Sequence, residues 1–180
     1  MNKRIIPMLF VATALMLTGC GKKTNSQNGS GDNSGGDTST PTSGQTSGQE
    51  NTYKTLDITG ETMGGKMDAA GAYQKTIDGL TIAVSNGKID ENYDTHQMEI
   101  RIYKNQTITF TATELKKIEF TCVANGSAER GPGNFTTASG GYTFEEAGPK
   151  GTWEGSAASV EFKAEGSQVR CLTISVTYKK

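Results

Sequence analysis

The segment Ile174-Ser175-Val176-Thr177-Tyr178 decides the fold class of this chain, because apolar and polar side chains alternate along it without a break. The same alternation occurs in Val160-Glu161-Phe162-Lys163-Ala164 and in Ile118-Glu119-Phe120-Thr121-Cys122. A period of two places successive side chains on opposite faces of an extended strand, one face buried and the other wet. These segments therefore predict half-buried β-strands.

The alternation extends over most of the chain upstream of these segments. Further alternating sets are Leu56/Ile58, Leu80/Ile82/Val84, Met98/Ile100/Ile102 and Ile108/Phe110. Turn signals separate the strands at Asn86-Gly87, Lys104-Asn105, Asn125-Gly126 and Glu165-Gly166-Ser167. Residues 59–79 and 124–141 lack the pattern, so we expect long loops or sheet edges there. The sequence predicts an all-β fold, an antiparallel β-sandwich of jelly-roll kind.

The composition excludes several classes of function. The 180 residues include 18 basic and 19 acidic side chains and one histidine. No positive excess is available to neutralise a row of phosphates, which argues against a nucleic-acid partner. One histidine removes most Ser/His and Cys/His catalytic arrangements, and no Gly-x-Ser-x-Gly motif occurs. We therefore expect a single domain that is not an enzyme.

The first twenty residues have the order of an export signal. Lys3-Arg4 precedes an apolar run from Ile5 to Leu17, which is too short to span a membrane comfortably. The run ends in Leu17-Thr18-Gly19-Cys20, which resembles the lipobox of bacterial lipoproteins. The resemblance implies that residues 1–19 are cleaved and that the Cys20 thiol carries a diacylglycerol anchor. It also implies an extracytoplasmic protein held on the cell membrane or the outer membrane.

A composition change divides the remaining chain into a tether and a domain. Beyond the cysteine, residues 20–52 consist almost entirely of Gly, Ser, Thr, Asn and Gln, which cannot build a core. We expect a flexible, disordered tether there. Residues 53–180 contain every alternating segment and the only tryptophan, so they are expected to form the β-sandwich domain.

A second resemblance rests on the order of strand-like segments. Its segments are Arg101-Ile102-Tyr103, Thr107-Ile108-Thr109, Ile118-Glu119-Phe120-Thr121, Trp153-Glu154-Gly155, Val160-Glu161-Phe162 and Ile174–Tyr178. This order is similar to a β-sandwich module that recurs in bacterial surface lipoproteins and secreted proteins. Related jelly-roll modules often bind carbohydrate, although the fold alone does not imply a function.

Four residues form the candidate ligand site. Tyr93 and His96 lie in the loop that enters the strand around Ile100, and Arg101 and Tyr103 share the face of that strand opposite its apolar side chains. An aromatic ring can stack on a sugar while Arg and His donate to its hydroxyls. The alternative is an ordinary solvent-facing surface.

Two further motifs concern cofactors. Asp90, Asn92 and Asp94 have the D-x-N-x-D spacing that can direct oxygens at one Ca²⁺, but the rest of an EF-hand is absent. The alternative is a solvated polar loop. Residues 60–67 have the spacing of a P-loop as far as Lys66, but Met67 stands where a Mg²⁺-binding Ser or Thr is required. We expect no nucleotide.

Cys122 and Cys171 remain as a pair once Cys20 is lipidated, in a compartment where oxidation can occur. Alternation from Ile174 turns Cys171 outward, so both thiols face the core only if a bulge interrupts the strand near Leu172-Thr173. A disulfide and two buried free thiols both stay open.

These inferences favour a membrane-anchored, non-catalytic binding protein whose ligand is a glycan. The alternative is a structural or protein-interaction lipoprotein of the cell envelope.

Overall fold

The computed structural model describes residues 52–180. The expected signal peptide, Cys20 and the tether up to residue 51 lie outside the described residues. The elements are β1 (Lys54–Ile58), α1 (Gly60–Met63), β2 (Gly71–Ile77), β3 (Leu80–Glu91), β4 (Met98–Ile102), β5 (Thr107–Cys122), η1 (Pro132–Asn134), β6 (Phe135–Thr136), β7 (Tyr142–Phe144), β8 (Lys150–Ala164) and β9 (Val169–Lys179). No helix in this part of the chain has the length and apolar character that crossing a membrane requires.

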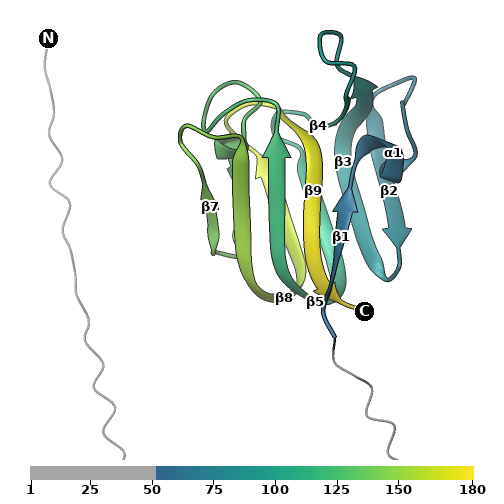
Figure 1. Cartoon of the computed structure of the whole chain (residues 1–180), viewed down its shortest axis with the longest axis vertical. Helices are drawn as coiled ribbons and strands as arrows, with labels where there is room; N and C mark the ends of the chain where they lie inside the picture. Colours follow the sequence, from purple (N-terminus) through teal and green to yellow (C-terminus); the bar gives the residue numbers. More distant parts are fainter. Residues whose placement is uncertain (1–51) are drawn as a thin grey trace, which may run out of the picture. The chain divides into compact units, whose positions relative to one another are not determined.

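The strands of the described region form one antiparallel, nine-stranded sheet, which confirms the all-β prediction (Figure 1). The order is β1-β9-β4-β3-β5-β8-β6, with β2 paired to β3 and β7 paired to β8. Strand β5 also pairs with β9, so that β3, β4, β9 and β5 close a circuit of pairings. All nine strands therefore belong to one continuous sheet.

Strand β5 makes this continuity possible because it bends. The rings of Phe110 and Phe120 have centroids 6.0 Å apart, although ten residues separate them on one strand. A straight strand would place them about 33 Å apart, at roughly 3.3 Å per residue. Register shifts between Thr111 and Leu115 and between Leu115 and Lys117 mark the bend. The sheet therefore folds back over its own apolar face.

The core lies inside this fold. Alternate residues of β5 are buried and their neighbours are partly wet, as on a sheet with one apolar face. The rings of Phe110, Phe120 and Phe162 meet edge to face at the centre, with Phe135 and Tyr142 packed against them. Such aromatic groups supply a large buried apolar area.

One local prediction is wrong. Asn86-Gly87 is not a turn but lies within β3, where Gly87 pairs with both Gly71 and Ile102. A Cβ on Gly87 would lie 2.1 Å from the Arg101 carbonyl oxygen, so the glycine serves close strand approach and not chain reversal. At residues 59–79 and 124–141, where long loops or sheet edges were expected, the structure has the edge strands β2, paired with β3, and β6, paired with β8, together with the short helices α1 and η1.

Candidate functional site

The candidate site is the loop of residues 92–97 and the charged side chains beneath it, between β3 and β4. Asn92 shapes this loop: its Oδ1 accepts hydrogen bonds from the backbone N–H groups of Asp94 (2.9 Å) and Thr95 (3.1 Å). The loop closes where the Asn92 N–H donates to the Gln97 carbonyl over 2.9 Å. Asparagine favours such turns because its short side chain can bond to the backbone nearby.

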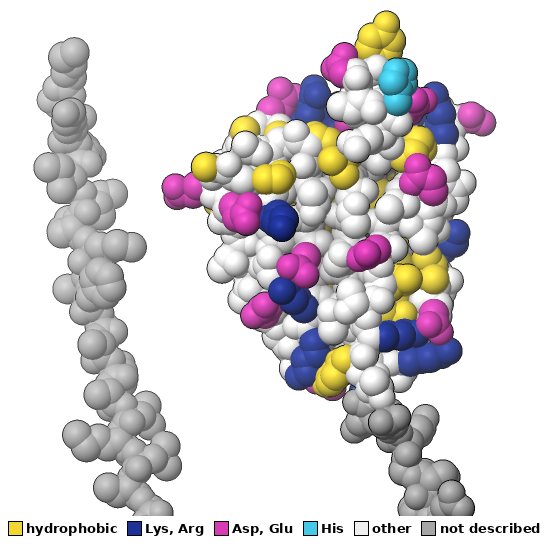
Figure 2. All heavy atoms as spheres, viewed as in Figure 1, with side chains coloured by type: hydrophobic (Ala, Val, Ile, Leu, Met, Phe, Trp, Pro, Cys, Tyr) yellow, Lys and Arg dark blue, Asp and Glu magenta, His cyan; other side chains and the backbone are white. Residues whose placement is uncertain are grey.

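Tyr93 and His96 are two of the exposed residues of this loop. Tyr93 is 93% exposed, far more than the other large hydrophobic residues of the described region. His96 adopts a left-handed backbone with φ of 54°, and its Nδ1 lies 2.8 Å from Glu91 Oε1. Figure 2 shows hydrophobic (yellow) and histidine (cyan) side chains together at one end of the molecule. The structure therefore presents both predicted residues to solvent at the same end.

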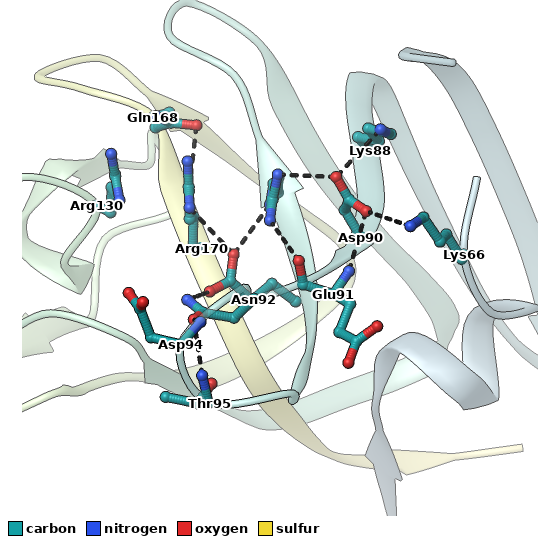
Figure 3. Close-up of polar contacts among 12 residues, drawn as sticks. Lys66, Lys88, Asp90, Glu91, Asn92, Asp94, Thr95, Arg130, Gln168 and Arg170 are labelled. Carbon is teal, nitrogen blue, oxygen red and sulfur yellow. Dashed lines mark hydrogen bonds and ion pairs between the residues drawn. The ribbon is translucent and has the colours of Figure 1, made fainter. Parts of the chain in front are cut away.

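Beneath the loop lies a carboxylate that the sequence analysis does not single out. Glu99, on β4, is fully buried. Its Oε2 accepts hydrogen bonds from Arg101 Nε (2.9 Å) and from Arg170 Nη1 (3.3 Å), and its Oε1 accepts from Asn92 Nδ2. One carboxylate thus joins β4, β9 and the base of the loop. Figure 3 labels two of its partners, Asn92 and Arg170.

Arg101 connects this carboxylate to a second one. Its Nη1 donates to Asp90 Oδ2 over 3.1 Å and its Nη2 donates to the Glu91 carbonyl over 3.2 Å. Lys88 and Lys66 lie 3.1 and 3.5 Å from the same Asp90 carboxylate. Hydrogen bonding from Lys88, and then the positive charge of Arg101, lower the pKa of Asp90. Ion pairs with Glu99 and Asp90 therefore hold the Arg101 side chain in place.

The four predicted ligand residues are consequently not equivalent. The structure brings Tyr93 and His96 onto one exposed loop and places Arg101 at its base. Arg101 is mostly buried and uses its donors on protein oxygens, so it positions the loop and does not face solvent. Tyr103 follows the end of β4 and is half-buried, and within residues 52–180 no hydrogen bond or ring contact joins it to the other three.

The register in which β3, β4 and β9 pair explains why the sequence alone does not point to Glu99 and Arg170. Arg101 pairs with both Lys88 and Arg170, and Asp90 pairs with Glu99. Each residue alone is an unremarkable polar position of an alternating strand. Only the pairing of β3, β4 and β9 collects them on one face, and only the loop above buries Glu99.

Two residues of the calcium motif, Asp90 and Asn92, have other partners. Asp90 is surrounded by cationic side chains, and Asn92 Oδ1 accepts from the loop backbone. Residues 52–180 hold no cluster of three or more His, Cys, Asp or Glu suited to a metal ion. Calcium binding through Asp90, Asn92 and Asp94 stays a prediction.

Two shallow hollows flank the loop. One, of about 290 Å³, is lined by His96, Gln97 and Met98 of the loop side and by Thr59, Glu61, Leu172 and Thr173. The other, of about 340 Å³, is lined by Asn92, Asp94, Thr95, Gln97, Cys122, Val123, Asn125, Pro149 and Leu172. Amide, hydroxyl and carboxylate groups are therefore available on both sides of the loop that carries Tyr93.

Cys122, which lines the second hollow, meets Cys171 in the core. Thr121 pairs with Thr173 and Cys122 pairs with Cys171, so Leu172 is the extra residue of a β-bulge. The bulge turns both thiols into the core, with their Sγ atoms 3.8 Å apart. They are free thiols in this structure, and burial raises the pKa of the Cys171 thiol. A disulfide between them stays a prediction.

No family model, curated protein or solved structure matches this chain.

Proposed function

We propose that this chain is an extracytoplasmic lipoprotein whose β-sandwich domain, of jelly-roll kind, binds a glycan without catalysing a reaction. The observation that carries the proposal is Tyr93, an aromatic side chain 93% exposed at the tip of an anchored loop. A monomeric protein gains nothing in stability from such a ring, because it buries almost no apolar area. Stacking on the apolar face of a sugar would account for the exposure of the ring.

The setting of the ring supports the same ligand class. Sugars need a few polar groups placed beside an apolar platform. His96, Asp94 and Gln97 supply donors and acceptors in and around the two hollows. The buried Glu99 carboxylate holds the base of the loop, so less conformational entropy is lost when a ligand binds.

Replacing Tyr93 with alanine should weaken glycan binding by about 1–3 kcal/mol, the scale of a single anchor residue. Stability should change by less than about 0.5 kcal/mol, because the ring is exposed. A glycan array with the full chain identifies the ligand, and calorimetric titration of that ligand measures the change.

The matched control is Tyr53→Ala. Tyr53 is 38% exposed and donates to Glu114 Oε2 over 2.6 Å, in the part of the sheet where Glu114 pairs with Lys179. It should bind the glycan as the unaltered chain does. Equal affinity of the Tyr93 variant and the unaltered chain would contradict the proposed site. Capture of an envelope protein with no array signal would favour the interaction alternative.

The proposed anchor has its own test. Cys20→Ser should leave an unprocessed, unlipidated precursor, because the Cys20 thiol is the acceptor for the diacylglyceryl group. The variant should lose partitioning into the detergent phase and the mass of the acyl chains, which phase separation and intact-mass measurement record. Retention of full detergent partitioning in the Cys20 variant would overturn the lipoprotein assignment.

A further inference from the structure

Arg130 lies directly beside Arg170, next to the base of the candidate loop. The Arg170 N–H donates to the Arg130 carbonyl over 3.2 Å, and Arg130 forms an isolated parallel bridge with Val169. The two side chains stand next to each other in Figure 3. The two positive charges are close enough for Arg130 to act on Arg170.

Few negative charges compensate these groups. Among the described residues, the carboxylate that contacts Arg170 is Glu99, and Glu99 is already shared with Arg101. Gln168 Oε1 accepts weakly from Arg170 Nε, at 3.5 Å. Burial, and then the positive charge of Arg101, lower the pKa of Arg170, and Arg130 acts in the same direction.

Both arginines keep N–H groups that no described residue bonds, and the side chains of Arg130 and Arg170 are 38% and 15% exposed. Within residues 52–180, Arg170 Nη2 and both Nη atoms of Arg130 make no hydrogen bond. Glu129 contacts Arg130 through Nε alone, at 3.2 Å, and its side chain is 69% exposed. Asp94, on the neighbouring loop, pairs with neither arginine. An incoming anion would compete with one exposed carboxylate.

The backbone around Arg130 is built to hold it in place. Arg130 has φ of 74°, a left-handed conformation that a side chain of this size rarely adopts. The Asn134 side chain closes the loop by donating to the carbonyls of Ala128 (2.8 Å) and Gly131 (3.0 Å). A Cβ on Gly131 would lie 2.5 Å from the Gly126 carbonyl oxygen, so the loop packs tightly. Strain of this kind is concentrated at binding sites.

We propose that Arg130 and Arg170 bind the oxyanion of an acidic sugar, a carboxylate or a sulfate ester, and so select the ligand of the loop. Guanidinium groups suit such oxyanions because their planar N–H pairs match two oxygens at once. Glu99 contacts both Asn92 of the loop and Arg170, which places the two parts of the site side by side. The inference rests on the proposed function and names its substrate class.

The test uses the full chain and three probes: methyl glucuronide, methyl glucoside and inorganic sulfate. Titrations followed by NMR read the Nε–H signals of Arg130 and Arg170 directly. The glucuronide should shift both signals and bind more tightly than the glucoside. Its affinity should fall with added salt, since salt screens an exposed ion pair.

Arg130→Asn removes the guanidinium while suiting the left-handed backbone, which asparagine tolerates. Its affinity for the glucuronide should fall about tenfold, the effect of losing one charged hydrogen-bond partner. The matched control is Lys163→Asn, which removes one exposed cation that also lies beside an acid, Glu165, at 3.4 Å. The control should leave the affinity unchanged.

Equal binding of glucuronide and glucoside, or sulfate binding with no preference for the acidic sugar, would overturn this inference. Neither result touches the proposed function, which the array and the Tyr93 variant judge independently. If Tyr93→Ala did not weaken glycan binding while glucuronide binding still depended on Arg130, the stacking role of Tyr93 would be contradicted and the anion site would be supported.

Discussion

Replacing Glu99 with alanine is expected to lower the free energy of unfolding by about 3 kcal/mol, the low end of the cost of removing one partner of a buried ion pair. The change leaves the charges of Arg101 and Arg170 without their shared carboxylate and Asn92 Nδ2 without its acceptor. The low end applies because both arginine side chains are 15% exposed and can recruit water. Urea unfolding measures the loss.

Glu129→Ala is the control for this variant. It also removes one carboxylate beside an arginine, but the Glu129 side chain is 69% exposed. Exposed pairs contribute about 0–1 kcal/mol, so its unfolding midpoint should hardly move. If Glu99→Ala were no less stable than Glu129→Ala, the network would not be what fixes the loop base.

Phe120→Ala should cost about 3–5 kcal/mol, the range for removing a buried aromatic side chain. Phe120 is fully buried, and its ring centroid lies 4.8 Å from that of Phe162 and 4.9 Å from that of Phe135. The cavity would open in the centre of the core, where the rings of Phe110, Phe135 and Phe162 pack against Phe120. Thermal and urea unfolding measure the change.

Phe144→Ala is the matched control, since Phe144 is 38% exposed on the short strand β7. Its loss should stay below about 1 kcal/mol, because less apolar area leaves water there on folding. Similar losses for the two variants would mean that Phe120 is not at the centre of the core.

Alternation was sufficient to predict β1, β4 and β9 because each presents one face to the core. It could not show that Thr107–Cys122 is a single strand. The buried positions there run Ala112, Leu115 and Ile118, at a spacing of three, because the bulges of the bend add unpaired residues. A spacing of three breaks the period that a strand prediction depends on.

The candidate site also has residues that the sequence could predict and residues that it could not. An exposed Tyr93 and His96 could be expected from a polar loop between two apolar strands. The burial of Glu99 could not, because it depends on which strands are neighbours and on a loop folding over them. A polar residue at a wet position of an alternating strand is normally solvated, and pairing across three strands reverses that expectation here.

The pairing of β1 with β9 also controls when folding can finish. Lys54 pairs with Tyr178, so the first strand of the domain finds its partner only at the end of the chain. Contacts between such distant residues make folding slow, in the millisecond-to-second range for all-β domains. Strand β1 of a nascent chain therefore stays unpaired until β9 has been made. We propose that this chain crosses a membrane before it folds. The delay then keeps the polypeptide unfolded, as translocation requires.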